Sequence, residues 1–571
     1  MRRCALTAVV AASLAAGLAV GAPPTSAGAA PPATKLVRLP FPKYDGNLTP
    51  YTFELGYPLV TLVYDTLLWR DAQGVPRSWL ARSVTRSKGG RRLTIRLRKG
   101  VRWHDGRPLR AADVEFTFQL FARRPQPRFT PELTDVEGVR ATGPLTVTID
   151  LRRASLGFDD QPLADLPILP RHLWRGIPDN QVPRGLPVGT GPYRLVSAQP
   201  RKGYVFRSNR TYFKGRPRVE RLEVPIIRQE DRTYSALRGR KVDMLPISLP
   251  MKPGEDLGGA FGIDLRTGPS YSGTALVFNA RRSPFNRLAA RRAVARALDL
   301  GRIVRNVGPA VPATRGYIHP ASRWSSARVL QRFNASAARG AVAGLDLPNI
   351  RVLAPENDPV RLEAGRQVML ALRRAGAKST FAKLSSEKLG QAIGEDGSTP
   401  AFDAAIVSIP ALVSYDPGFL TKVFGSDTAT APLNFAGYRS ARFAANAERV
   451  ASAKDVSARR RAVGAELALL ASDLPQVPLF FSRGTFAYRP AIYDGWTFIK
   501  GTGILDKRSF LPGQGPATRG PGGAGIDQSA DDSESGSVLD VLATASLVVL
   551  ALVVAVGLAG VLWRRRSVER R

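Results

Sequence analysis

The sequence predicts a mixed fold of helices and strands, α/β or α+β, arranged in two or three lobes and followed by one C-terminal transmembrane helix. Helical and strand periodicities alternate along the interior of the chain, which is typical of this class. The globular part, residues 36–511, is too long for one simple hydrophobic core. Both ends of the chain carry segments that indicate export and membrane attachment.

The N-terminus has the layout of a secretory signal peptide. Two arginines precede an apolar stretch at 5–20, and Ala27 and Ala29 fit an A-x-A cleavage site. We therefore expect residues 1–30 to be removed after export; a retained N-terminal anchor is the alternative. Cys4, the only cysteine, lies before the end of the apolar stretch, so it does not fit a lipid attachment site. The mature chain then has no disulfide, no thiolate metal site and no cysteine nucleophile.

The C-terminus carries a second membrane signal. Residues 541–563 contain no charge, which is long enough to cross a hydrocarbon core of about 30 Å. Three arginines follow, so the tail 564–571 is predicted to be cytoplasmic and the rest of the mature chain to lie outside. Residues 512–540 are rich in Gly, Pro, Ala, Ser and Asp and are expected to form a flexible linker. The LPGQG sequence at 511–515 faintly resembles a cell-wall sorting signal, which leaves wall attachment as an alternative.

The chain is strongly basic, with a net charge of +37 from 83 Lys and Arg against 46 Asp and Glu. Such a charge first suggests nucleic-acid binding. The arginines are scattered, however, and no dense basic run is interleaved with aromatic residues. We therefore expect no nucleic-acid partner. A surface of this charge should still be attracted to anionic lipids or wall polymers.

Periodicity places several helices and strands along the globular part. Segments that alternate polar and apolar residues, or that are rich in β-branched residues, predict strands, and segments with an apolar residue every three to four positions predict helices. The predicted strands are 91–97, 145–151, 275–278 and 404–407. The predicted helices are 111–121, 291–298, 362–375 and 458–472.

No motif in the chain indicates an enzyme, a metal site or a cofactor. His104 precedes Asp105 and Gly106, a turn sequence, and is interpreted as a structural histidine. The glycines at 189 and 191 lack the third glycine of a phosphate-binding loop, so a tight turn is expected there. Asp159 and Asp160 are adjacent, and in an extended chain they point in opposite directions, which prevents a working acid–base pair.

The region from residue 67 to 118 carries a resemblance to a known family. It reads LLWRDAQGVPRSWLARSV at 67–84 and RRLTIRLRKGVRWHDGRPLRAADVEFTF at 91–118. This resembles the signature region of solute-binding protein family 5, the extracytoplasmic receptors of oligopeptide, dipeptide and nickel ABC transporters. The matching positions are Asp71, Gly74, Leu80, Ala81, Leu97, Arg98, Gly100, Val101, Trp103, His104, Asp105, Gly106, Pro108, Leu109, Ala111, Asp113 and Val114.

Further segments match the family in the expected order, so the resemblance spans about residues 48 to 496. They are VGTGPY at 188–193, NRTYFKGRP at 209–217, GRKVD at 239–243, FN at 278–279, RAVARALDLGR at 292–302, the Asp-Pro pair at 416–417 and LPQVPL at 474–479. Arg110 stands where the family has threonine, and Phe213 where it has tryptophan.

The resemblance implies an α/β fold of the bilobed periplasmic-binding-protein type II, in its large three-part cluster. The N-terminal lobe would comprise 31–270 and 486–511, with an inserted subdomain at about 60–180, and the C-terminal lobe 271–485. A ligand would bind between the lobes, which close around it. The implied function is that of a monomeric ABC-importer receptor for peptides or similar small solutes, partnered by membrane permease subunits. A membrane-anchored sensor or scaffold with the same fold is the alternative.

Three loops are candidates for the ligand site, because such sites combine aromatic walls with a few polar groups. They are residues 47–57, 269–274 and 409–416, and we expect at least one of them to line the cleft. The candidate residues are Tyr51, Phe53, Glu54, Tyr57, Tyr271, Ser272, Val413, Tyr415 and Asp416.

One departure from the family concerns Val413. In peptide-binding members an aspartate at this position binds the α-ammonium group of the peptide, as the resemblance implies. A buried, unpaired ammonium is costly, so a peptide receptor needs a replacement carboxylate. Glu54 and Asp416 are the candidates, although Asp416 precedes a proline and equally fits a helix cap. The departure favours a solute other than a free-amine peptide, or a sensing role.

Overall fold

The computed structural model describes most of the chain between residues 34 and 513. The predicted signal peptide, the transmembrane helix, the cytoplasmic tail and nearly all of the linker lie outside the described residues. Within the described residues, no helix is both long and apolar enough to cross a membrane. The internal gaps in the description are 54–55, 127, 130–132, 247–248, 250–255, 258–261, 309, 327–332, 357 and 428–430.

The described chain folds as two compact units. Unit 1 contains the residues up to Gly268 and those from Gly484 onwards, and unit 2 contains Pro269–Arg483. Each boundary falls inside a long strand, β11 (Asp264–Phe278) or β16 (Gln476–Tyr488). The polypeptide therefore passes between the units within two strands, which are neighbours in the sheet of unit 2.

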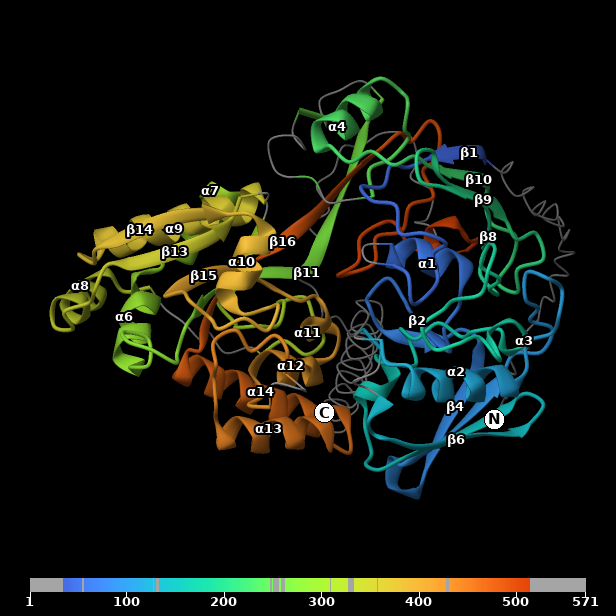
Figure 1. The fold of residues 1–571 in the computed structure, drawn as a ribbon, viewed down its shortest axis with the longest axis horizontal. Helices are drawn as coiled ribbons and strands as arrows, with labels where there is room; N and C mark the ends of the chain where they lie inside the picture. The colour runs from blue at the N-terminus through green and yellow to red at the C-terminus, as the bar shows by residue number, and fades with distance from the viewer. Residues whose placement is uncertain are drawn as a thin grey trace, which may run out of the picture. The chain divides into compact units, whose positions relative to one another are not determined.

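Unit 1 contains two four-stranded sheets and a short hairpin (Figure 1). One sheet has the order β1-β10-β9-β8, with β1 parallel to β10 and the other pairs antiparallel; the second is antiparallel, with the order β4-β5-β7-β6. The strands are β1 (Thr34–Arg38), β2 (Leu68–Arg70), β3 (Pro76–Ser78), β4 (Ala81–Ser87), β5 (Arg92–Leu97), β6 (Val136–Gly143), β7 (Thr146–Leu151), β8 (Tyr193–Gln199), β9 (Gly203–Ser208) and β10 (Val219–Val224). The helices are α1 (Tyr57–Val63), α2 (Ala111–Arg123), α3 (Arg171–Trp174) and α4 (Glu230–Arg238), and the 3₁₀ turns include η3 (Gly157–Asp159) and η5 (Lys507–Phe510).

The second sheet of unit 1 is built on a simple alternation. In β5, Leu93, Ile95 and Leu97 are buried while the residues between them are less so. Helix α2 packs against β6 and β7 and contributes Phe118 and Phe121 to the same core. Burial of this one face follows from the period of two along a strand and the apolar stripe of the helix.

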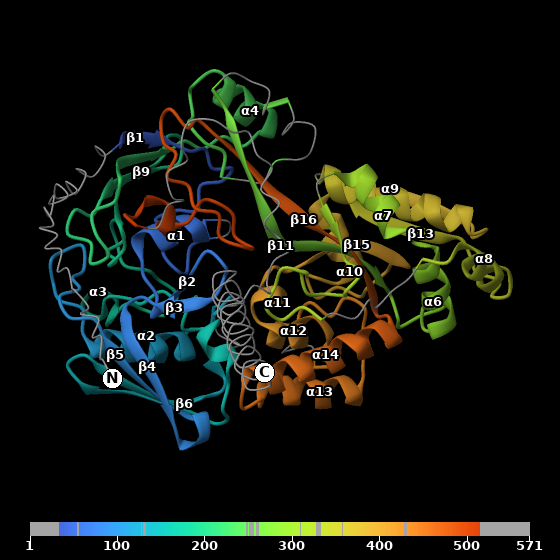
Figure 2. The ribbon, with the colours of Figure 1, turned by 180° about the vertical axis from the view of Figure 1, so that it is seen from behind.

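Unit 2 is a six-stranded mixed sheet with the order β12-β16-β11-β15-β13-β14 (Figures 1 and 2). Its other strands are β12 (Ala310–Pro312), β13 (Ile350–Pro355), β14 (Ser379–Leu384) and β15 (Ala404–Ile409). Its helices are α6 (Leu288–Ala297), α7 (Leu300–Val307), α8 (Ala335–Ala343), α9 (Pro359–Arg374), α10 (Ser386–Ile393), α11 (Leu412–Tyr415), α12 (Leu420–Phe424), α13 (Ala441–Ala451) and α14 (Val456–Asp473), with the 3₁₀ turn η4 (Pro417–Phe419) between α11 and α12.

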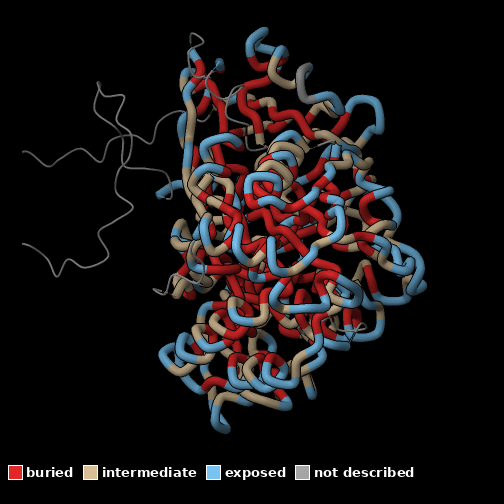
Figure 3. The backbone as a smooth tube through the Cα atoms, turned by 90° about the vertical axis from the view of Figure 1, so that its left-hand side faces the viewer, coloured by how far each residue is buried: buried red, intermediate tan, exposed pale blue. Residues whose placement is uncertain are grey.

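Both faces of the unit 2 sheet are buried. Along β11, Leu276 and Phe278 belong to the core that includes residues of α6 to α9, whereas Ala275 and Val277 belong to the core that includes residues of α10 to α14. This is why the end of β11 and most of β15 are continuous apolar runs, as expected for central strands covered by helices on both sides. Figure 3 shows the buried residues concentrated inside the molecule and the exposed ones at its peripheral turns.

The helices and strands predicted in the globular part all occur in the structure, and all but one lie within a few residues of their predicted ends. The largest difference concerns β11, which was expected at 275–278 and begins at Asp264. Only its last part is fully buried, so the apolar signal that predicts a strand is confined to that part. The remainder is extended by backbone pairing, which leaves no periodic signal in the sequence.

The VGTGPY segment forms a tight turn pressed against the end of α1. A Cβ atom on Gly189 would lie 1.9 Å from the carbonyl oxygen of Val63, and one on Gly191 would lie 2.3 Å from that of Leu62. The amide of Gly191 donates a 2.8 Å hydrogen bond to the Val63 carbonyl. Both glycines are therefore required by close backbone approach, as the interpretation of this motif as a turn anticipates.

The side chain of His104 forms hydrogen bonds with both glycines of this turn. Its Nδ1 accepts a 3.3 Å hydrogen bond from the amide of Gly189, and its Nε2 lies 3.0 Å from the carbonyl of Gly191. Nε2–H is therefore the donor of the second bond. Burial lowers the pKa of His104 to about 4, which keeps the ring neutral and in this tautomer. The histidine has the structural role predicted from its turn sequence.

A buried ion pair links the two ends of the unit 1 chain. Lys507 Nζ lies 2.7 Å from Oδ1 of Asp65, and both side chains are fully buried. The same carboxylate accepts hydrogen bonds from the Trp79 indole, the Tyr212 hydroxyl and the Thr190 hydroxyl. Because removal of one partner would leave a charge buried and unpaired, this network fixes the returning segment after β16 in unit 1.

Candidate functional site

The predicted site residues of unit 1 form an aromatic group around α1 and α2. Tyr51 stacks on Phe121 with ring centroids 4.9 Å apart, and its hydroxyl donates to the carbonyl of Arg124 at 3.1 Å. Phe53 packs at 5.4 Å from Tyr57. All three predicted residues are half-buried. Glu54, the predicted residue between them, lies outside the described residues.

Tyr57 connects this aromatic group to a buried charge. Its hydroxyl donates to Oδ1 of Asp165 at 2.9 Å, and the guanidinium of Arg128 lies 3.8 Å from its ring centroid. Arg128 also forms a 2.9 Å ion pair with Asp165, whose side chain is 1% exposed. Burial alone would raise the pKa of Asp165, but Arg128 and Arg70 outweigh it and hold the pKa below its ordinary value. The carboxylate is thus charged and satisfied.

The predicted site residues of unit 2 form a second aromatic group. Tyr271 on β11 and Tyr415 on α11 have ring centroids 4.9 Å apart, and both are buried. The His319 ring lies 5.3 Å from Tyr271. Trp324 donates its indole N–H to the carbonyl of Tyr415 at 2.9 Å. The structure therefore brings two of the three predicted loops together within this unit, through Tyr271 and Tyr415.

Val413 and Asp416 have different environments in the same loop. Val413 is 1% exposed and belongs to the apolar core below α11. The Asp416 carboxylate accepts a 3.0 Å hydrogen bond from the amide of Gly418, as a cap of η4. It also forms a buried ion pair with Arg459 of α14. Within unit 2 the charge of Asp416 is therefore already balanced by Arg459, and its carboxylate is also hydrogen-bonded to a backbone amide.

Behind this ion pair lies an acidic residue that sequence reasoning missed. Glu466 of α14 is 1% exposed, and none of the described residues contributes a hydrogen bond to its Oε2. Burial raises the pKa of Glu466 to about 8; Arg459 opposes the rise and Asp416 adds to it. In the sequence Glu466 looks like an ordinary helix residue, since nothing in the helical pattern marks it as buried.

Other residues of the two groups also escaped prediction. Arg128, Asp165 and Trp324 lie in irregular segments, where periodicity carries no signal, and no motif around His319 marks it as part of a site. Ser272, which was predicted, is exposed on β11. Among the described residues no cluster of three or more His, Cys, Asp or Glu side chains is arranged to hold a metal ion.

The comparison with known families matches most of the chain. The model of bacterial extracellular solute-binding proteins, family 5, aligns with residues 75–431, well over half of the sequence. Among curated proteins, the oligopeptide-binding protein AppA of Bacillus subtilis is 24% identical over 265 residues. That alignment covers 45% of this chain and 48% of AppA, so it spans about half of the relative's length.

Solved structures share the fold across nearly their whole length. The ABC transporter substrate-binding protein CtaP of Listeria monocytogenes superimposes with a TM-score of 0.75 at 19% identity, covering 84% of this chain and 99% of CtaP. NikZ of Campylobacter jejuni, solved in complex with Ni(L-His), gives a TM-score of 0.69 at 21% identity, covering 80% of this chain and 94% of NikZ. These likenesses show an α/β periplasmic-binding-protein fold. With the family match across its middle, this chain belongs to family 5 of the bacterial extracellular solute-binding proteins.

Proposed function

We propose that this protein is the extracytoplasmic receptor of an ABC importer and captures a peptide or a similar small solute. The observation that carries the proposal is the family match over residues 75–431. The known neighbours support the solute class, since AppA is an oligopeptide-binding protein and NikZ holds a nickel complex of histidine. The chain's role is binding rather than catalysis.

The binding residues in this proposal are the two aromatic groups. The proposed ligand contacts of unit 1 are Tyr51, Phe53 and Tyr57. Those of unit 2 are Tyr271 and Tyr415, with Ser272 as an exposed polar contact. Aromatic walls with few polar groups suit ligands of mixed chemistry. The engagement of Asp416 with Arg459 argues against Asp416 as the carboxylate for a peptide ammonium. The proposed ligand therefore has its amine bound elsewhere, for which Glu54 remains the candidate, or carries no free amine.

The mechanism in this proposal is closure of two lobes around the solute. Both chain crossings between the units occur within strands, which suits a hinge made of a few extended residues. The closed form would present a composite surface to the permease subunits. The binding part would act as a monomer, exported by the segment 1–30 and tethered through the linker 512–540 to a single transmembrane helix at 541–563. Such tethering keeps the receptor at high effective concentration near its transporter.

A thermal-shift screen of the full-length chain tests the proposal. The panel contains di- to pentapeptides, sugars, nickel chelates and amino-acid derivatives. A ligand at a hundred times its Kd adds about 2.7 kcal/mol to the free energy of unfolding, which gives a clear rise of the midpoint. We expect such a rise with at least one class. A rise with peptides that disappears on N-acetylation would show that a carboxylate replaces the aspartate absent at Val413.

Two other outcomes would change the assignment. A rise with another solute class and none with peptides would keep the receptor function and exclude peptides. Silence across the whole panel would contradict the proposal and favour a membrane-anchored sensor or scaffold.

A further inference from the structure

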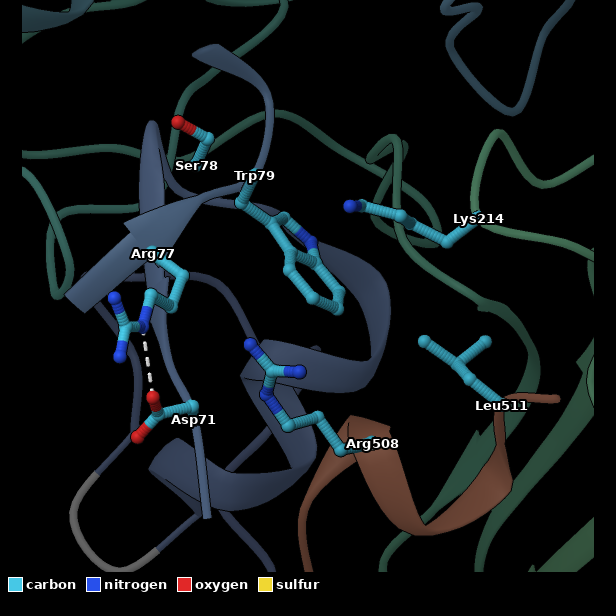
Figure 4. A pocket seen from close by; sticks show the side chains of 7 residues that line it. All are labelled: Asp71, Arg77, Ser78, Trp79, Lys214, Arg508 and Leu511. Atoms are coloured by element: carbon cyan, nitrogen blue, oxygen red, sulfur yellow. Dashed lines mark hydrogen bonds and ion pairs between the residues drawn. The ribbon is translucent and has the colours of Figure 1, made fainter. Parts of the chain in front are cut away.

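A pocket of about 230 Å³ lies in unit 1 (Figure 4). It shares no lining residue with the aromatic group of Tyr51 and Tyr57. We name it the Trp79 pocket. Its walls come from the β2–β3 hairpin, from the loop after β9 and from η5 at the end of the described chain. The residues that matter to its chemistry are Asp71, Arg77, Trp79, Lys214 and Arg508.

The charges that line the Trp79 pocket are unbalanced. Three cations, Arg77, Lys214 and Arg508, line it with one carboxylate, that of Asp71. This carboxylate already has partners. It accepts a 2.8 Å hydrogen bond from the guanidinium of Arg77, and it accepts hydrogen bonds from the backbone amides of Gln73 and Val75 in the hairpin turn. Among the side chains that line the pocket, positive charges therefore outnumber negative ones, although the carboxylate of Asp506 also acts on Arg508 from behind the lining.

The wall of the pocket is held rigidly. Trp79 is 2% exposed, and its indole N–H donates to Asp65 at 2.8 Å, which fixes the ring. Lys214 Nζ lies 4.8 Å and the Arg508 guanidinium 4.9 Å from the ring centroid. Figure 4 shows both side chains directed toward the indole. Arg508 is further fixed by a 2.6 Å hydrogen bond from its Nε to the carbonyl of Arg70.

Lys214 forms no ion pair with any of the residues that the structure describes. Among the described residues, none forms an ion pair or a hydrogen bond with its ammonium group; its contact is the cation–π contact with Trp79. Burial lowers the pKa of Lys214, the positive charges of Arg98 and Arg508 lower it further, and the more weakly felt carboxylate of Asp65, which is paired with Lys507, only partly opposes them. A half-buried ammonium in positive surroundings is unfavourable, and a bound anion would relieve both the repulsion and the lost solvation.

We propose that the Trp79 pocket binds a phosphate-type oxyanion, either free in solution or carried by a lipid headgroup. The guanidinium fork and the ammonium supply the charge-assisted donors that such oxygens prefer. This site is independent of the solute-binding function proposed above. Its occupancy stabilises unit 1 where the segment after β16 returns to the β2–β3 hairpin.

Isothermal titration of the full-length chain with inorganic phosphate tests the site, with sodium chloride at equal ionic strength as the reference. We expect phosphate to bind, and Lys214→Ala to weaken its binding about tenfold, the effect of losing one charge-assisted hydrogen bond. Lys202→Ala is the matched control, because Lys202 is an exposed lysine of the same unit and its loss changes the net charge equally. Lys214→Arg should keep most of the affinity.

A gain of affinity provides a second test. Asp71→Asn keeps an oxygen acceptor for the turn amides but removes the negative charge of the pocket, so phosphate should bind several-fold more tightly. Phosphatidylglycerol vesicles distinguish the source of the anion. If the vesicles compete with phosphate for the wild type but not for Lys214→Ala, the anion is a lipid headgroup. If the vesicles do not compete with phosphate, the anion is free in solution. No phosphate binding beyond chloride, or equal binding by Lys214→Ala and Lys202→Ala, would overturn the proposal.

Discussion

Individual buried charges define the chemistry of this chain at the scale of residues. In unit 2, Arg459 faces two carboxylates, those of Asp416 and Glu466, and forms its ion pair with Asp416. One cation cannot balance two buried anions, so the second carboxylate favours its protonated form. The raised pKa of Glu466 results chiefly from its burial, to which the charge of Asp416 adds against the opposing charge of Arg459, and it makes the stability of this region depend on pH.

The pH dependence of stability tests this environment. The folded pKa of Glu466, about 8, exceeds the ordinary value of 4.5, so its stabilising effect is complete below pH 4.5 and is lost as the pH rises toward 8. Glu466→Gln mimics the protonated acid, and so it should match the wild type near pH 5 and exceed its thermal midpoint near pH 8.5.

The matched control for this prediction is Glu387→Gln, which changes an exposed glutamate on α10 and should track the wild type at both pH values. If the thermal midpoint of Glu466→Gln differs from that of the wild type by the same amount at pH 5 and at pH 8.5, the assignment of a buried, protonated carboxyl is contradicted.

At the scale of elements, the contact between the VGTGPY turn and the end of α1 sets the geometry of unit 1. The turn leads directly into β8 and packs against the C-terminal end of α1. It also places Thr190 where its hydroxyl donates a hydrogen bond to Asp65. The family motif is thus explained by backbone packing. No phosphate-binding role needs to be assigned to its glycines.

Gly189→Ala should destabilise the protein strongly, because the new methyl group would overlap the carbonyl of Val63 and displace α1. We expect a loss of about 3 kcal/mol in the free energy of unfolding, measured by urea titration with tryptophan fluorescence. Gly138→Ala on β6 is the control, since its Cβ would meet no atom within 4 Å, and it should change stability by less than about 0.5 kcal/mol. Equal effects of the two substitutions would refute the packing explanation.

At the scale of the whole molecule, the proposed function requires the two units to move as separate bodies. Each unit has its own cores, and the chain crosses between them within β11 and β16. Separate cores allow relative motion without loss of packing. The proposal that the lobes close around a solute therefore makes a prediction about the dimensions of the protein in solution.

Small-angle scattering measures this closure. With a solute that raises the thermal midpoint, the radius of gyration should fall, because hinge closure brings the two units together. An N-acetylated or otherwise inactive analogue of the same solute is the control and should leave the radius unchanged. An unchanged radius with a tightly bound solute would exclude lobe closure while leaving solute binding intact.

The sequence by itself determined the family, the α/β class, the main helices and strands and the turn roles of His104, Gly189 and Gly191. These features depend on local periodicity and on short motifs, which adjacent residues encode. Tertiary structure decided the rest. It paired Tyr271 with Tyr415, gave Asp416 to Arg459, buried Glu466 and placed Lys214 and Arg508 on one tryptophan. Such pairings join residues far apart in the chain, and their burial and electrostatic balance arise only when the elements within each unit pack together.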